Sequence, residues 1–218
     1  MESYRLDALG HTAHLALFRP LSNGAALRQR LVAASQAPAT PDGDAERQAV
    51  DFAFVDARAV TSRLHVLTAV TQALLAKQQG TMKTKTSHSE VLWALEPGTN
   101  ITDSLKHFGL SPSTKSLLLV HLAPLSSASE QADAAAQAEE NRDVLRRLEE
   151  IVEGSPLGSL EELGRLPEGG TDEKGLRKLY KLNGPDAAVF SGLKLGTEEH
   201  LEALDRLAVS SVALKTAA

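Results

Sequence analysis

Basic side chains gather in one segment of an otherwise acidic chain. The 218 residues carry 28 Asp and Glu against 23 Lys and Arg, which gives a net charge of -5 at pH 7. Residues 57–89 contain no acid at all, although the chain average predicts about four there. Their ionisable side chains are those of Arg58, Arg63, Lys77, Lys83, Lys85, His65 and His88. A segment without acids keeps a local attraction for phosphates, because a carboxylate within a Debye length, roughly 8 to 10 Å, would cancel part of it. A chance gap on a solvated surface is the open alternative.

A second feature is an apolar stripe on a short predicted helix, residues 101–108. Ile101, Leu105 and Phe108 share one face, Asn100 can cap the start, and Gly109 follows the last turn. A helix of about two turns is not stable alone, so this face needs a partner surface. That surface is either the chain's own core or a second protein.

The sequence gives no support for catalytic or metal-binding chemistry. The chain has no cysteine, which excludes disulfides, thiol catalysis and thiolate metal sites. His11 and His14, three apart near a strand, point to opposite faces and predict no metal site. Ser155 stands outside a G-x-S-x-G elbow, and the acids at 149–153 and 161–162 have the pattern of a solvated surface. We therefore expect no enzyme activity, cofactor or metal.

The helices and strands that position these side chains are predicted from the spacing of apolar residues and from the capping and turn residues between them. Strands are predicted at residues 14–18, 52–55, 87–95 and 116–122. Helices are predicted at 25–34, from a cap at Asp56 to Gly80, at 101–108, 144–152 and 176–182, and after a cap at Thr197. Residues 36–48 and 126–138 are expected to be mobile insertions. The pattern predicts an α+β fold, a mixed and largely antiparallel sheet flanked by helices, in a single domain over residues 1–218.

Targeting signals are not visible in the sequence. The first 18 residues carry Asp7, His11 and His14 and lack a basic head before an apolar core. The densest apolar run, residues 117–122, is about a third of the ~20 residues that a membrane helix needs. We expect an intracellular soluble protein.

Three segments carry a resemblance to a known family. They are GTMKTKT at 80–86, followed by Glu90 and Val91 opening an apolar strand, NITDSLKHFGL at 100–110, and LRKLYKL at 176–182. In this order they resemble the PRPK-binding protein family, the accessory subunit of the KEOPS (EKC) complex. Residues 36–48 and 126–138 depart from the shorter members, which suggests a fungal-type length.

The resemblance implies a non-catalytic subunit. It would bind the complex's small atypical kinase and help recruit tRNA, through the CCA end, for threonylcarbamoylation of the adenosine beside the anticodon. The transfer chemistry would belong to another subunit. Members of this family are expected in the nucleus and cytoplasm, and in fungi they also act at telomeres.

Each expected role falls on particular residues. Phosphate contacts are expected from Arg63, Lys77, Lys83 and Lys85, with His65 stacking on a base or donating a hydrogen bond. Kinase docking is expected from Ile101, Leu105, Phe108 and Leu110, with Lys106 as a rim charge. If the opposite face of the helix is the exposed one, docking moves to Ser104, Lys106 and His107.

Two other functions stay open. The chain could be a small enzyme whose site one sequence does not reveal, in which case a closed pocket should hold titratable residues with perturbed pKa values. It could also be a stand-alone RNA-binding adaptor that retains tRNA and does not bind the kinase.

Overall fold

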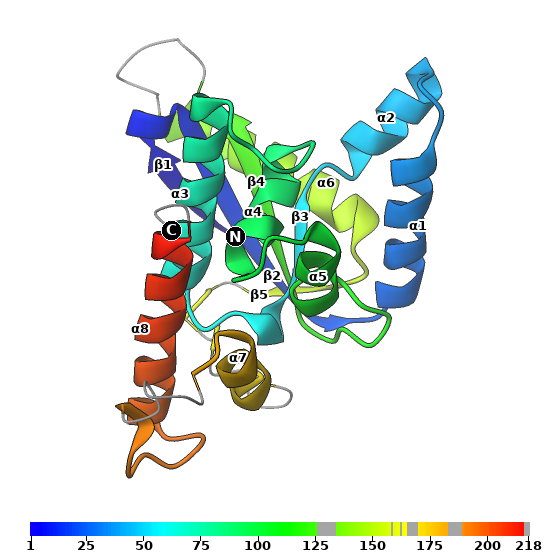
Figure 1. Cartoon of the computed structure of the whole chain (residues 1–218). Coiled ribbons are helices and arrows are strands. Elements are labelled where there is room, and N and C mark those ends of the chain that lie inside the picture. Colours follow the sequence, from blue (N-terminus) through cyan, green and yellow to red (C-terminus); the bar gives the residue numbers. More distant parts are fainter. Residues whose placement is uncertain (126–133, 158, 162, 165–169, 183–188, 216–218) are drawn as a thin grey trace. The chain divides into compact units, whose positions relative to one another are not determined.

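Two compact units make up the chain in a computed structural model (Figure 1). Unit 1 comprises residues 1–55 and 110–159, and unit 2 comprises residues 56–109 and 160–218. The structure describes residues 1–125, 134–157, 159–161, 163–164, 170–182 and 189–215. Each unit is described by itself below.

Unit 1 is built on an open sheet with strand order β1-β2-β4-β3, and β5 also pairs with β2. β2 pairs antiparallel with β1, β4 and β5, and His14 lies opposite His121 in the register with β4. The strands are β1 (Glu2–Leu6), β2 (His11–Leu21), β3 (Ala53–Asp56), β4 (Leu117–Pro124) and β5 (Gly154–Leu157). The α+β class and the antiparallel character of the sheet are thus confirmed.

The core of unit 1 forms where helices meet this sheet. Alternate residues of β2 and β4, including Phe18 and Leu119, cluster with Leu148 of α6 and Leu27 of α1. The helices of the unit are α1 (Gly24–Gln36), α2 (Pro41–Ala49) and α6 (Ala134–Ile151), and a short η1 (Asp7–Leu9) joins β1 to β2. Burial of this cluster holds the helices on the sheet.

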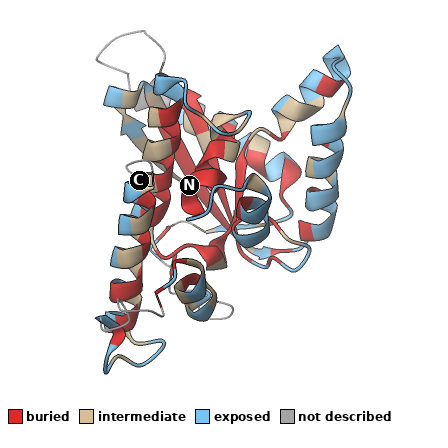
Figure 2. Ribbon diagram, viewed as in Figure 1, coloured by how far each residue is buried: buried red, intermediate tan, exposed pale blue. Residues whose placement is uncertain are grey.

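Unit 2 is helical. Its elements are η2 (Ala57–Ala59), α3 (Arg63–Gln79), α4 (Ser87–Leu95), α5 (Ile101–His107), α7 (Glu173–Leu179) and α8 (Glu198–Leu214). α3 packs against both α4 and α8. Its buried face includes Val66, Val70 and Leu74, which recur at helical spacing. Figure 2 shows this buried stripe along the helix.

Residues 87–95 are a helix, so the predicted strand is wrong. Thr86 caps α4 by accepting a hydrogen bond from the amide of Ser89 at 3.1 Å. Val91, Leu92, Trp93, Ala94 and Leu95 are all buried. Because this turn of helix is buried all round, it shows no 3.6-residue period, and an accidental alternation imitated a strand.

Two other predicted elements also differ. α2 (Pro41–Ala49) takes up most of residues 36–48, so the loop expected there is wrong; Thr40 caps the helix and Pro41 stands in its first turn. Asp56 caps the short η2 through the amide of Arg58, and the long helix begins later, after Ser62. Of the second expected insertion, residues 126–133 lie outside the described residues, and α6 begins at Ala134.

Candidate functional site

The loop at residues 81–86 joins α3 to α4 and presents two of the expected tRNA-binding lysines. It begins after Gly80, whose φ of 66° ends α3 in the left-handed conformation that glycine favours. Lys83 and Lys85 are exposed. Within the part of the chain that the structure describes, neither ammonium lies in an ion pair.

A buried carboxylate holds this loop in place. Glu90 of α4 is 1% exposed and accepts hydrogen bonds from the amides of Lys83 at 3.0 Å and Thr84 at 2.8 Å. The Thr84 hydroxyl donates a further bond to the same carboxylate at 2.6 Å. The lysine side chains therefore project from a backbone fixed to α4. This role of Glu90 was missed, because in the predicted strand Glu90 was one more alternating polar residue.

The other two expected cations lie at opposite ends of α3. Lys77 is exposed in the last turn, next to the loop, whereas Arg63 is exposed in the first turn. At 1.5 Å per residue the two positions are about 21 Å apart along the helix. This separation exceeds the Debye length, so Arg63 lies apart from the cations at the loop end of α3.

His65 is not exposed, so its ring cannot contact an RNA base. Its ring is fully buried, with Nδ1 3.3 Å from the amide of Thr61 and Nε2 2.9 Å from the hydroxyl of Tyr180. Burial lowers the pKa of His65 from 6.5 to about 4, against the opposing charge of Asp205. The expected stacking contact is therefore corrected: His65 is a neutral residue of the helical core. His88 is also buried.

The short helix expected to carry the docking residues, α5, forms as predicted. The Asn100 side chain accepts a hydrogen bond from the amide of Thr102 at 2.9 Å and so caps its start. Leu105 is 51% exposed, Lys106 is exposed and Ile101 is partly exposed. We call these three exposed or partly exposed residues the α5 face.

Three of the other residues predicted for docking are inside. Phe108 is fully buried and Leu110 is 7% exposed, so both are corrected to core positions. Ser104 is buried too, and its hydroxyl donates to the carbonyl of Asn100 at 3.1 Å, so the alternative face keeps only Lys106 and His107 in solvent. His107 is exposed, and its Nδ1 lies 2.7 Å from the Glu96 carboxylate.

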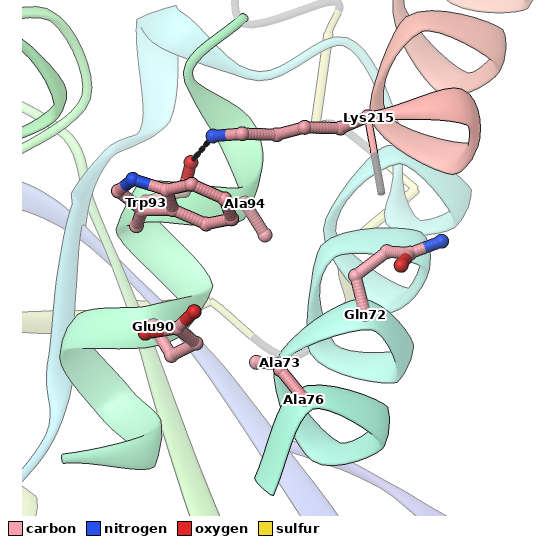
Figure 3. A pocket seen from close by; sticks show the side chains of 7 residues that line it. All are labelled: Gln72, Ala73, Ala76, Glu90, Trp93, Ala94 and Lys215. Carbon is pink, nitrogen blue, oxygen red and sulfur yellow. Dashed lines mark hydrogen bonds between the residues drawn. The ribbon is translucent and has the colours of Figure 1, made fainter. Parts of the chain in front are cut away.

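A further contact that the sequence did not suggest lies at the end of α8. Gln72, Ala73 and Ala76 of α3 face Glu90, Trp93 and Ala94 of α4, and Lys215 reaches in from beyond α8 (Figure 3). The cavity that these residues line has a volume of about 10 Å³, room for roughly one water. The only signal in the sequence was a basic residue just after the last apolar turn.

In the part of the chain that the structure describes, no three His, Cys, Asp or Glu side chains are grouped to hold a metal ion. No described helix has the length and hydropathy needed to cross a membrane. A wider, open groove of about 550 Å³ runs along α1 in unit 1 and is lined by Arg28, Val32 and neighbouring side chains.

Comparisons with known proteins agree with the resemblance. Residues 18–216 match the family model described as "Kinase binding protein CGI-121". The chain is similar to the EKC/KEOPS complex subunit CGI121 of Coccidioides immitis, with 30% identity over 100% of this chain and 98% of the relative. The corresponding subunit of Aspergillus fumigatus is 31% identical over 84% of each chain. That of Schizosaccharomyces pombe is 31% identical over 84% of this chain and 91% of the relative. The chain therefore belongs to the CGI-121 family of kinase binding proteins.

Proposed function

We propose that this protein is a non-catalytic subunit of an EKC/KEOPS-type assembly. In this role it binds the assembly's small atypical kinase and helps recruit tRNA, through the CCA end, for threonylcarbamoylation of the adenosine beside the anticodon. Support comes from the family description, which names kinase binding, and from the relatives' names as complex subunits. The observation that carries the kinase proposal is the half-exposed Leu105, a large apolar side chain left in solvent on a short helix.

The α5 face has the composition of a small docking surface. Full burial of a leucine side chain contributes roughly 1.5 to 3 kcal/mol, so covering the exposed half of Leu105 contributes about 1 kcal/mol. Ile101 extends the apolar area, and the exposed Lys106 can steer an acidic partner without adding much affinity. Leu105 is thus the centre of the proposed contact.

The kinase proposal is tested with Leu105→Glu and a matched control. Leu195 is 49% exposed in the same unit, so Leu195→Glu introduces the same charge at the same exposure outside α5. Co-elution and titration calorimetry with the purified kinase should show binding by the wild type and the control and none by Leu105→Glu. Equal binding by all three chains removes α5 from the interface, and no binding by the wild type removes the kinase as a partner.

For tRNA, the exposed lysines of the loop at residues 81–86 are the proposed phosphate contacts, with Lys77 beside them. The hydrogen bonds from the loop to Glu90 fix the backbone between them, so less conformational freedom is lost on binding. Each phosphate contact contributes about 0.7 to 0.9 to the slope of log affinity against log salt. Arg63 can add a contact only with a ligand that also covers the far end of α3.

The tRNA proposal is tested by the double variant Lys83→Glu with Lys85→Glu. Binding to tRNA with an intact CCA end should be lost or reduced by at least tenfold, and the salt slope should fall by about 2. The control, Lys174→Glu with Lys178→Glu, changes the charge equally at two exposed positions of α7. Unchanged tRNA binding by the loop variant contradicts the assignment.

Three outcomes separate the other functions. Retention of tRNA with no co-elution of the kinase supports a stand-alone RNA-binding adaptor. Turnover of a metabolite by the purified chain supports a small enzyme. We also propose residence in the nucleus and cytoplasm, and a telomere role in fungi; fluorescence microscopy of the tagged chain and telomere length in a deletion strain test these two points.

A further inference from the structure

The junction between α4 and α5, residues 96–100, is held by side chains from several helices. The hydroxyl of Tyr180 donates to the carbonyl of Leu95 at 2.8 Å. The indole of Trp93 donates to the carbonyl of Thr99 at 3.3 Å, and Glu96 accepts from the amide of Gly98 at 3.3 Å. The path of the chain from α4 into α5 is therefore fixed at both ends.

Lys215 supplies the cation at this junction. Its ammonium donates hydrogen bonds to the carbonyl of Trp93 and, at 2.6 Å, to the carbonyl of Glu96, and it lies 3.3 Å from the centre of the Trp93 ring (Figure 3). The last carbonyls of a helix have no partner within the helix and carry partial negative charge. Lys215 satisfies these groups at the end of α4 and adds a cation–π contact.

Glu96 transmits this constraint to α5. Its backbone carbonyl is bound by Lys215, while its buried carboxylate lies 2.7 Å from Nδ1 of His107 in the last turn of α5. α5 has seven residues, too few to be stable without such external contacts. Its orientation, and with it the direction of Leu105, depends on the position of Glu96.

We propose that Lys215 is a positioning residue for kinase docking: it fixes the end of α4 and, through Glu96, orients the α5 face. This inference rests on the proposed docking function of α5. Lys215 touches no partner in this scheme, and its contribution is to reduce the freedom that α5 must lose when it binds. Arginine at this position can keep both the charge and the stacking on Trp93, whereas methionine keeps only the apolar stem.

Because the charge on Lys215 can be titrated, its effect on kinase affinity can be measured by changing the pH. Burial lowers the pKa of Lys215 from 10.5 to about 8, against the opposing charges of Glu96 and Glu90. Within the described part of the chain, Glu90 of α4 and Glu96 just after it are the acids whose charges act on Lys215; the α3 residues that line the same cavity, Gln72, Ala73 and Ala76, do not titrate. Between pH 7 and pH 9, therefore, the ammonium of the wild type loses its proton, and a guanidinium at the same position does not.

The experiment compares the full-length wild type with Lys215→Arg, Lys215→Met and the exposed control Lys174→Met. Kinase affinity should fall about tenfold in Lys215→Met, stay within about twofold in Lys215→Arg and be unchanged in the control. From pH 7 to pH 9, the ratio of wild-type to Lys215→Arg affinity should fall about fivefold; this ratio cancels titration of the kinase. Amide hydrogen exchange should accelerate across residues 96–107 in Lys215→Met.

The outcomes separate this inference from the function on which it rests. A pH-independent ratio, with wild-type affinity in Lys215→Met, overturns the positioning role even when Leu105→Glu abolishes binding. Global loss of folding in Lys215→Met leaves the pH comparison of the wild type with Lys215→Arg as the deciding measurement. If the wild type does not bind the kinase, the docking function fails, and unchanged exchange across residues 96–107 then overturns the positioning of α5 separately.

Discussion

Lowering the pH should destabilise unit 2, because His65 is buried and neutral in the folded chain. The hydroxyl of Tyr180 has one proton, which it donates to the carbonyl of Leu95 at 2.8 Å, so Nε2 of His65 must be the donor in their 2.9 Å bond. Nδ1 then accepts from the amide of Thr61 at 3.3 Å, while the Thr61 hydroxyl donates to Asp205 at 2.6 Å. His65 is thus neutral, with its proton on Nε2.

The size of this loss of stability follows from the pKa of His65. Burial places the pKa of His65 at about 4 in the folded chain, against 6.5 for an ordinary histidine. Because the unfolded chain takes up this proton at higher pH, the stability is fully present above pH 6.5 and is lost as the pH falls toward 4. At roughly 1.4 kcal/mol per pH unit, the loss between pH 7 and pH 5 is about 2 kcal/mol, and about 3 kcal/mol over the whole range.

Urea unfolding of the wild type and of His65→Gln at pH 7 and pH 5 measures this contribution. Both chains keep His14, whose pKa is also lowered, mainly by burial, so its effect cancels in the double difference. The pH-dependent loss should be about 2 kcal/mol smaller in the variant. Equal losses, or a His65 imidazole that titrates near pH 6.5 by NMR, would refute the assignment of a neutral buried ring.

Three further predictions concern stability and local order. Phe108→Ala should cost about 3 to 5 kcal/mol in chemical denaturation because the ring is fully buried, whereas Leu105→Ala should cost less than about 1 kcal/mol; similar losses would contradict the assigned faces of α5. Gly80→Ala should lower stability by about 1 kcal/mol, since its φ is 66°, and an unchanged melting temperature would argue against this helix end. Glu90→Gln should speed hydrogen exchange at the two loop amides that Glu90 binds; slow exchange in the variant would show that the loop is held by something else.

Local signals in the sequence were sufficient for several elements. Asn100 and Thr197 cap α5 and α8 as predicted, because a capping side chain bonds an amide only two or three residues away. Gly80 ends α3 for an equally local reason. The antiparallel sheet of unit 1 followed from short apolar strands with turn residues between them. Whether the whole chain is one domain stays a prediction.

The features that the sequence did not predict depend on contacts between residues far apart in the chain. His65 was expected at the surface, yet its ring binds Tyr180, which lies 115 residues further along the chain. Phe108 and Leu105 share a stripe in the sequence, and only the packed structure shows that one is buried and the other half-exposed. The resemblance pointed to the loop and to α5, and the packing shows which of their side chains reach solvent.

The element that the sequence misassigned, α4, is the one to which both candidate surfaces are attached. At its first turns Thr86 and Glu90 hold the loop that carries Lys83 and Lys85. After its last turn Glu96 holds α5 through His107. The nine residues of α4 span about 14 Å, so this largely buried helix sets the separation between the two surfaces. A strand of the same residues would have been about twice as long and would have placed them further apart. The helical state of α4 is therefore what allows one small chain to offer a basic loop and an apolar helix at a fixed distance.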